Sequence, residues 1–257
     1  DAITAAKAGE QIRFNPRFSE TLGALLQNSA DHAFVAQVLA LPSESDIARE
    51  IQNDIDHDAI YAARKALREA IGRQIMPILE KAHDSLTQSL PYQPDARSAG
   101  QRALRNAALD LLVAGAPDHY LPLAKSCYDK ADNMTDRIAA LSALCQTPNA
   151  DREAALQDFA TRYQNEALAL DKWFALQAGA PDRGGDVLPK VRQLMQHPDF
   201  NLRNPNLARS LIFSYCVANP GAFHRADASG YVFWAERVLE LDMSEVHAAV
   251  AAQQDEE

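Results

Sequence analysis

A series of helix pairs in the second half of the sequence constrains the fold most strongly. From residue 101 onward, apolar side chains recur every three or four residues in segments that are separated by short loops carrying Gly, Pro, Asn or Asp. The segments pair as 103–114 with 121–131, 135–145 with 151–163, 167–177 with 187–196, and 207–217 with 231–241. Successive pairs follow at intervals of about 30 to 40 residues, the spacing of TPR, HEAT and armadillo repeats. The sequence therefore predicts an all-α fold, a superhelical array of antiparallel helix pairs, although the pairs do not resemble one another in sequence.

The composition supports helices and counts against several classes of protein. Gly is scarce, at 10 of 257 residues, while Ala and Leu dominate, which favours helix over a β-rich or Rossmann-type fold. The formal net charge of −10 counts against a general nucleic-acid binder, which needs a concentrated positive surface. No apolar run approaches the roughly 20 residues of a membrane span. We expect neither nucleic acid nor membrane among the partners.

The cysteines indicate the compartment. Cys127, Cys145 and Cys216 lie far apart in apolar helical contexts, and no CxxC pair occurs. An odd number of such cysteines predicts buried free thiols in a reducing environment. The first residues, DAITAAKAGE, do not form a signal peptide and lack an initiator Met. We expect a cytoplasmic protein, and this opening suggests a fragment or a processed chain.

The domain limits follow from the same patterns. We expect a short lead-in over residues 1–17, a helical domain over 18–242 and an atypical acidic tail over 243–257. The clearest linker is the Pro-rich loop near residues 89–100, which has few apolar anchors.

Two local signals in the first half predict where helices begin and break. Ser43, followed three residues later by Asp46, resembles a capping box at a helix start. Pro77 lies inside the periodic run 56–90 and predicts a kink or break near Ile75.

No motif in the chain carries catalytic or metal chemistry. None of the seven histidines forms HxxxH or His-Glu-x-x-His, and the cysteines and histidines have no zinc spacing. The phosphate-binding Gly-rich motifs and GxSxG are also absent from the sequence. Ser210, Ser214 and Cys216 are nucleophiles by residue type only, because no base accompanies them. We therefore expect no catalytic residue and no metal ligand in this chain.

Three polar or aromatic groups have a structural and a functional interpretation. Arg102 and Arg105 lie on one helical face and suit a carboxylate ligand, but an intramolecular salt bridge is favoured. Trp173 heads an apolar helix, where a core anchor is favoured over a ligand-facing ring. Asn133 and Asp136 are typical of a capped helix start.

Residues 200–234 are least like a generic helical spacer. The stretch contains two Asn-Pro steps, at 204–205 and 219–220, and each predicts a turn followed by a helix. A strongly apolar helix lies between the two steps, and aromatic and charged residues follow the second one.

The charged residues of this stretch are the candidate site. His224 and Arg225, next to Asp227, either tie down a loop, which is favoured, or line a cleft. Arg203 and Arg209 flank the first Asn-Pro step, and their guanidinium groups suit a carboxylate from a neighbouring side chain or from a peptide terminus.

At this point the sequence resembles a known family. The segments that carry the resemblance are LPSESDIAREI (41–51), RALRNAALDLL (102–112), NMTDRIAALSAL (133–144), DKWFALQA (171–178) and NPNLARSLIFSY…NPGAFHRADASGYVFW (204–234). Together they look like the C-terminal helical domain of bacterial aminopeptidase N, a zinc metallo-aminopeptidase of the gluzincin class. The resemblance runs in order over residues 18–241, most of the chain.

The resemblance implies a four-domain parent enzyme that removes N-terminal residues from peptides. Its catalytic domain supplies the zinc ligands, the general-base Glu and the motif that holds the substrate's amine, and none of these motifs occurs here. The isolated chain is therefore expected to be inactive. Its implied role is to gate and shape access to the active site, with the parent's catalytic domain and the peptide substrate as partners.

The resemblance also assigns one residue and shows two departures. Arg209 matches the Arg of the family's NPNxxRSL motif, which faces the active-site chamber; Arg203, His224 and Arg225 are further substrate-channel candidates. Ala228 replaces a family Gly, at a cost of about 1 kcal/mol if its φ is positive. The family continues with further helices after the segment around Trp234, and the short tail here implies that those helices are absent or replaced. The alternative function is a free-standing helical-repeat module that binds a peptide or protein on its concave face.

Overall fold

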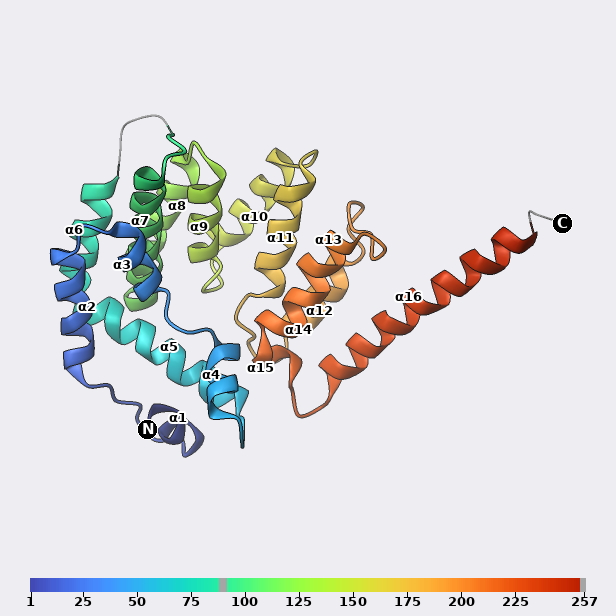
Figure 1. The fold of residues 1–257 in the computed structure, drawn as a ribbon, viewed down its shortest axis with the longest axis horizontal. Helices are drawn as coiled ribbons and strands as arrows, with labels where there is room; N and C mark the ends of the chain where they lie inside the picture. The colour runs from blue at the N-terminus through green and yellow to red at the C-terminus, as the bar shows by residue number, and fades with distance from the viewer. Residues whose placement is uncertain (88–91, 255–257) are drawn as a thin grey trace. The chain divides into compact units, whose positions relative to one another are not determined.

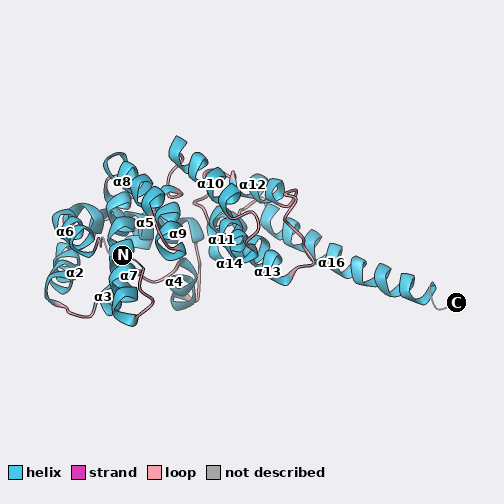
Figure 2. Cartoon of the chain, turned by 90° about the horizontal axis from the view of Figure 1, so that it is seen from above, coloured by secondary structure: helices cyan, strands magenta, loops and turns pink. Residues whose placement is uncertain are grey.

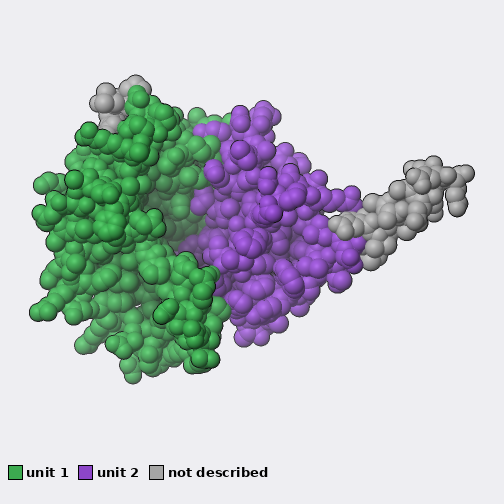
Figure 3. All heavy atoms as spheres, in the orientation of Figure 1, with its two compact units in different colours: residues 1–162 green, residues 163–257 purple. Residues whose placement is uncertain are grey.

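The computed structural model describes residues 1–87 and 92–254, without the side chains of 243–254, and every regular element in those ranges is a helix (Figures 1 and 2). The expected all-α class is confirmed. The chain divides into two compact units, unit 1 over Asp1–Arg162 and unit 2 over Tyr163–Glu257 (Figure 3). None of the described helices is both long enough and apolar enough to cross a membrane.

Unit 1 is built around one long helix, α7. Its helices are α1 (Ala2–Lys7), α2 (Pro16–Asn28), α3 (His32–Leu39), α4 (Glu44–Ile51), α5 (His57–Gln74), α6 (Met76–Leu86), α7 (Ala96–Gly115), α8 (Pro117–Lys130), α9 (Met134–Leu144) and α10 (Ala150–Arg162). Helix α7 packs against α3, α5, α6, α8 and α9. Its buried residues Leu104, Leu109, Leu111 and Leu112 form the centre of this core, so burial of apolar surface holds the unit together.

Local sequence fixes most helix starts in unit 1. The side chains of Asn15, Asp31, Ser43, Asp56, Asp95 and Asn133 each accept a hydrogen bond from a backbone N–H in the first turn of the following helix. Such N-caps satisfy N–H groups that have no partner within the helix. The capping box predicted from Ser43 and Asp46 is confirmed. The predicted break is also confirmed, because α5 ends at Gln74 and α6 begins at Met76.

The loop predicted over 89–100 differs from the structure at its C-terminal end. Helix α7 begins at Ala96, capped by Asp95, whose side chain accepts the N–H of Ser98 at 3.0 Å. The cap therefore extends the helix several residues toward the N-terminus. Residues 88–91 lie outside the described residues.

Helices α5 and α7 approach each other at a pair of glycines. A Cβ on Gly72 would lie 2.2 Å from the carbonyl oxygen of Leu111, and one on Gly115 would lie 2.6 Å from the carbonyl carbon of Gly72. Because backbone atoms lie on both sides of the contact, neither position has room for a side chain. These glycines allow the two helices to pack backbone to backbone.

Unit 2 contains shorter helices and one long one. Its elements are α11 (Ala167–Ala178), α12 (Val187–Leu194), α13 (Pro205–Ala208), the π-helix η1 (Arg209–Phe213), α14 (Ser214–Ala218), α15 (Pro220–Phe223) and α16 (Ser229–Gln254). The aromatic rings of Trp173, Phe174, Tyr215 and Phe233 lie in its core. The core interpretation of Trp173 is thus confirmed.

The apolar helix predicted over 207–217 is present but interrupted by the wider turn η1. The hydroxyl of Ser210 donates to the carbonyl of Leu207 at 2.9 Å, and that of Ser214 donates to the carbonyl of Arg209 at 3.2 Å. The second of these bonds spans five residues, in keeping with a π turn. Both hydroxyls act on the backbone, so the serines have a structural role.

Side-chain hydrogen bonds, a left-handed residue and a glycine contact define the turns between the helices of unit 2. The buried amide of Asn219 donates to the carbonyls of Ala178 at 3.1 Å and Ala180 at 2.7 Å. Ala228 has φ +59°, the left-handed conformation suspected from the sequence. A Cβ on Gly230 would lie 2.2 Å from the carbonyl oxygen of Phe223, so α15 and α16 meet where only glycine has room.

Candidate functional site

Arg209 lies on an exposed face of unit 2. It is the first residue of η1, and Phe213 and Val217 follow at four-residue intervals with 59% and 44% of their surface exposed. Within the described part of the chain, no carboxylate forms an ion pair with the guanidinium of Arg209. This exposed face therefore combines a cation with two apolar side chains.

Arg203 lies at a different place, a pocket of about 400 Å³ that it shares with Arg237, Phe200 and Leu241. Its own backbone N–H donates to the side chain of Asn201 at 2.9 Å. The second arginine of this pocket is already paired, because a guanidinium nitrogen of Arg237 lies 3.2 Å from the carboxylate of Glu240.

His224 and Arg225 act within unit 2. The ring nitrogen Nδ1 of His224 lies 2.5 Å from the hydroxyl of Tyr231. Arg225 pairs with Asp182 at 3.2 Å and with Asp227 at 3.5 Å.

The partner of Arg225 organises a second loop. The carboxylate of Asp182 also accepts the backbone N–H groups of Gly185 at 2.9 Å and Val187 at 3.1 Å. Arg225 therefore ties the segment before α16 to the segment before α12, the loop-holding role that the sequence favoured. Among the described contacts, none joins Arg203, Arg209 and this cluster into one site.

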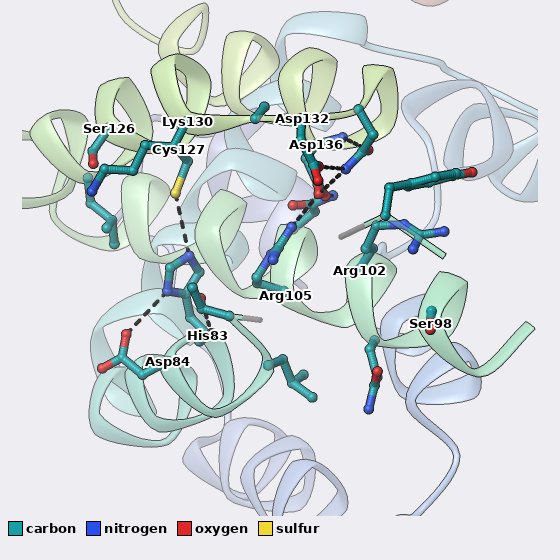
Figure 4. A pocket seen from close by; sticks show the side chains of 18 of the residues that line it. His83, Asp84, Ser98, Arg102, Arg105, Ser126, Cys127, Lys130, Asp132 and Asp136 are labelled. Atoms are coloured by element: carbon teal, nitrogen blue, oxygen red, sulfur yellow. Dashed lines mark hydrogen bonds and ion pairs between the residues drawn. The ribbon is translucent and has the colours of Figure 1, made fainter. Parts of the chain in front are cut away.

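A larger pocket, which the sequence did not predict, lies within unit 1 (Figure 4). It has a volume of about 750 Å³ and is lined by residues of α6, α7, α8 and the start of α9. This volume falls within the range of small-molecule sites in proteins.

The wall of this pocket contains a satisfied ion pair. Arg105 lies 2.5 Å from the carboxylate of Asp136, which also accepts hydrogen bonds from Asn106 at 2.9 Å and Asn133 at 2.7 Å. Burial alone would raise the pKa of Asp136, but the hydrogen bonds from Arg105, Asn133 and Asn106 outweigh it and lower that pKa below its usual value. The salt bridge favoured for Arg102 and Arg105 is confirmed for Arg105 but not for Arg102, which forms no ion pair within the described residues. The capping role of Asn133 is confirmed.

The rim of the pocket carries charges of both signs. The guanidinium of Arg102 lies over the ring of Tyr92, 4.5 Å from its centroid, and donates to the carbonyl of Gln93 at 2.8 Å. Lys130 and Asp132 add an exposed cation and an exposed carboxylate. The pocket can therefore receive a ligand that itself carries both charges.

A histidine and a cysteine meet on another wall of this pocket. The ring nitrogen Nε2 of His83, on α6, lies 3.7 Å from Sγ of Cys127, on α8. On the other side of the ring, Nδ1 lies 3.3 Å from the carboxylate of Asp84. The two helices bring His83 and Cys127 together from positions 44 residues apart, so no short-range spacing in the sequence signals the pair.

The zinc implied by the sequence resemblance does not fit the residues described in this structure. No three His, Cys, Asp or Glu side chains among them are grouped to hold a metal ion. A catalytic zinc site needs at least three protein ligands, so these residues do not supply one.

Comparison with known proteins places the chain among aminopeptidase domains. A family model described as a domain of unknown function (DUF3458_C) with ARM repeats matches residues 1–253. The chain is 38% identical to aminopeptidase N of Caulobacter vibrioides, over 93% of this chain and 27% of that protein. It is 37% identical to aminopeptidase N of Escherichia coli, over 85% of this chain and 25% of that protein.

A solved structure has the same fold. The crystal structure of Legionella pneumophila aminopeptidase A in complex with aspartic acid matches with a TM-score of 0.81 and 27% identity, over 94% of this chain and 29% of that one. The chain thus spans about a quarter of the length of the curated relatives it matches.

Proposed function

This chain belongs to the DUF3458_C family of ARM-repeat helical domains, found at the C-terminus of aminopeptidases, and on that premise we propose that its parent protein is a zinc aminopeptidase. The parent reaction is removal of N-terminal residues from peptides by a zinc-activated water. The observation that carries the proposal is the coverage, because nearly the whole chain aligns with only about a quarter of each aminopeptidase N.

Within the parent, this domain gates and shapes the path of a peptide to an active site that another domain supplies. Zinc belongs to that catalytic domain, and the described residues of this chain hold no group of metal ligands. The domain's own contribution is therefore binding and exclusion, through surfaces that face the substrate path. The three free thiols are consistent with a cytoplasmic location, which is part of the proposal.

The exposed face of Arg209, Phe213 and Val217 is the best candidate for such a surface. The guanidinium of Arg209, which has no ion-pair partner among the described residues, suits the carboxylate at the C-terminal end of a short peptide, and the apolar neighbours suit the peptide's side chains. Arg203 offers a second cation at its own pocket. His224 and Arg225 act indirectly, by holding the loops that they bridge.

The test of this assignment uses the longer protein that contains this chain. Arg209→Ala should raise KM for peptides about fivefold, since a charge-assisted contact contributes about 1 kcal/mol at an exposed site. KM for single amino-acid anilides, which have no distant carboxylate, should stay unchanged. Arg97→Ala, at an exposed arginine of α7 in unit 1, is the matched control and should change neither value.

Two outcomes would contradict this proposal. Equal changes in KM for peptides and anilides would remove the role of Arg209. If the gene encodes only this domain, there is no parent enzyme, and the second candidate function, a free-standing helical-repeat module, is favoured. That candidate is supported by the exposed apolar side chains of Tyr231, Trp234 and Leu239 on α16.

A further inference from the structure

The three free cysteines have different surroundings. Cys145 is buried, and burial raises its pKa to about 11. Cys216 is partly exposed, burial raises its pKa to about 11 too, and no other charged group adds to that shift. Cys127 is partly exposed, lines the unit 1 pocket and has an imidazole nitrogen beside its sulfur. Among the described residues, Cys127 is therefore the one cysteine that combines solvent access with a neighbouring base.

The base is itself oriented. His83 is 4% exposed, so its ring is fixed by packing, and its Nδ1 lies 3.3 Å from the carboxylate of Asp84. A carboxylate on Nδ1 favours the tautomer in which Nδ1 carries the proton and Nε2 is free to accept one. Asp84, His83 and Cys127 thus form a line of carboxylate, imidazole and thiol along the pocket wall (Figure 4).

At neutral pH the imidazole of His83 and the thiol of Cys127 are both uncharged. Burial lowers the pKa of His83, and the nearby Asp84 offsets this only in part. Burial likewise raises the pKa of Cys127, against the opposing effect of Arg105. The charged groups that act on the pair are Asp84, Arg105, Asp136 and Lys130. A neutral imidazole next to a protonated thiol is the arrangement in which His83 acts as a general base.

The pocket around the thiol indicates the class of reactant. Arg102 and Lys130 suit carboxylates, while Asp84 and Asp132 suit an ammonium group. A volume of about 750 Å³ accommodates a peptide of a few residues. We propose that Cys127 is a modification site at which a small, peptide-like disulfide bearing carboxylates forms a mixed disulfide, with His83 as the base and Asp84 as its orienting partner.

The exchange is balanced without a further reactant. The thiol proton of Cys127 passes to Nε2 of His83, and the thiolate sulfur attacks one sulfur of the incoming disulfide. The original S–S bond breaks as the new one forms, so the sulfur of Cys127 is oxidised and the departing sulfur is reduced. The departing thiolate takes the proton back from the imidazolium, which Asp84 stabilises while it exists.

Oxidised glutathione is the probe, added to the 257-residue chain at neutral pH. Mass spectrometry follows the mixed disulfide at each cysteine over time. Cys127 should react at least about tenfold faster than Cys216, since among the described residues a base lies beside Cys127 and none lies beside Cys216. His83→Gln should reduce the rate at Cys127 by about tenfold or more and leave Cys216 unchanged.

Internal controls keep the result interpretable. Cys145 is buried, so its modification reports unfolding of a variant. If modification of Cys145 shows that His83→Gln is unfolded, the rate at Cys127 is measured in Asp84→Asn instead. The side chain of Asp84 is 82% exposed, so its replacement leaves the packing intact. Asp84→Asn should slow Cys127 by about threefold. Equal rates at Cys127 and Cys216, or an unchanged rate in the folded variant, would overturn the proposal.

The charge preference has its own test. The wild-type chain should react faster with oxidised glutathione than with uncharged hydroxyethyl disulfide. Lys130→Gln should reduce that preference by about threefold, because the lysine attracts the carboxylates of the probe. Lys81→Gln, at an exposed lysine of α6 outside the pocket lining, is the matched control. Equal rates with both disulfides in the wild-type chain would overturn the assigned reactant class.

Discussion

Helices meet differently in the two units. In unit 1, α5 and α7 cross at Gly72 and Gly115 with their backbones in contact, and N-caps hold the helix starts. In unit 2, the helical segment formed by α13, η1 and α14 is followed by the short helix α15, and side chains hold the turns on either side of α15, above all Asn219 and Arg225. Helices of 18 and 20 residues bury enough surface to define their own crossing. A helix of four residues, such as α15, does not, so polar contacts at the turns specify its position.

The largest expected effect tests the backbone contact in unit 1. Gly115→Ala places a Cβ 2.6 Å from the carbonyl carbon of Gly72 and should lower the free energy of unfolding by about 4 kcal/mol. Urea unfolding measures the loss. Gly179→Ala in unit 2 is the control: its new Cβ lies 3.3 Å from its nearest atom, so the loss should stay below about 1 kcal/mol. If the free energy of unfolding falls by similar amounts in Gly115→Ala and Gly179→Ala, the backbones of α5 and α7 are not in tight contact.

The next effect tests the polar network around Asp136 in unit 1. Asp136→Asn leaves Arg105 without its carboxylate and should cost about 3 kcal/mol at pH 7. Because the folded-state pKa of Asp136 is lowered, its contribution is present above the unfolded pKa of about 3.9 and is lost as the pH falls through the lower, folded-state pKa. The wild-type chain should therefore lose stability in acid more steeply than the variant.

The pH dependence has a matched control in the exposed neighbour Asp132. Asp132→Asn should change the unfolding free energy by no more than about 0.5 kcal/mol and leave the acid slope intact. Chemical unfolding at a series of acidic pH values measures both variants. If the free energy of unfolding falls as steeply with pH in Asp136→Asn as in the wild-type chain, the ion pair does not cause the loss of stability in acid.

In unit 2, the turn contact of Asn219 should contribute less than the glycine crossing. Asn219→Ala leaves the buried carbonyls of Ala178 and Ala180 without their amide donor and should cost about 2 kcal/mol. Asn206→Ala, at an exposed asparagine of α13, should stay within about 0.5 kcal/mol. If both variants unfold at the same urea concentration as the wild-type chain, turn contacts do not specify unit 2.

The smallest effect has the opposite sign. Ala228 adopts φ +59°, and Ala228→Gly should stabilise the chain by about 1 kcal/mol because glycine adopts this conformation without strain. Thermal or urea unfolding detects the gain. Ala226→Gly, two residues earlier and without a positive φ, should be neutral or destabilising. A loss of stability in Ala228→Gly would show that the left-handed turn is not strained.

Helices were predictable where their signals are local. The cap at Ser43, the break at Pro77 and most helices of the pairs from residue 101 appear in the structure within a few residues of the predicted limits. Two helices are longer than predicted, because α7 begins at Ala96 instead of 103 and α16 continues to Gln254 instead of ending at 241. The interruption of 207–217 by η1 was not predictable, because a π turn leaves the apolar periodicity nearly unchanged.

The candidate sites divide in the same way. The resemblance to a family singled out Arg209, whose role stays a prediction. The salt bridge favoured for Arg105 is confirmed by the structure. The sequence named Arg102 and Arg105 as suited to a carboxylate ligand, but it did not predict the unit 1 pocket that they line or the line from Asp84 through His83 to Cys127. These side chains come from α6 and α8, and only the packing of both helices against α7 or its neighbours brings them together.

By itself, the sequence determined the all-α class, the helix starts and the family of this chain, because caps, prolines and periodicity act within a few residues of one another. The tertiary structure decided at which glycines there is no room for a side chain and which cysteine lies beside a base. Gly72 and Gly115 are ordinary helix residues until two backbones meet there, and Cys127 is an ordinary thiol until His83 lies 3.7 Å away. Distances between helices depend on packing across the whole unit, and no local pattern encodes them.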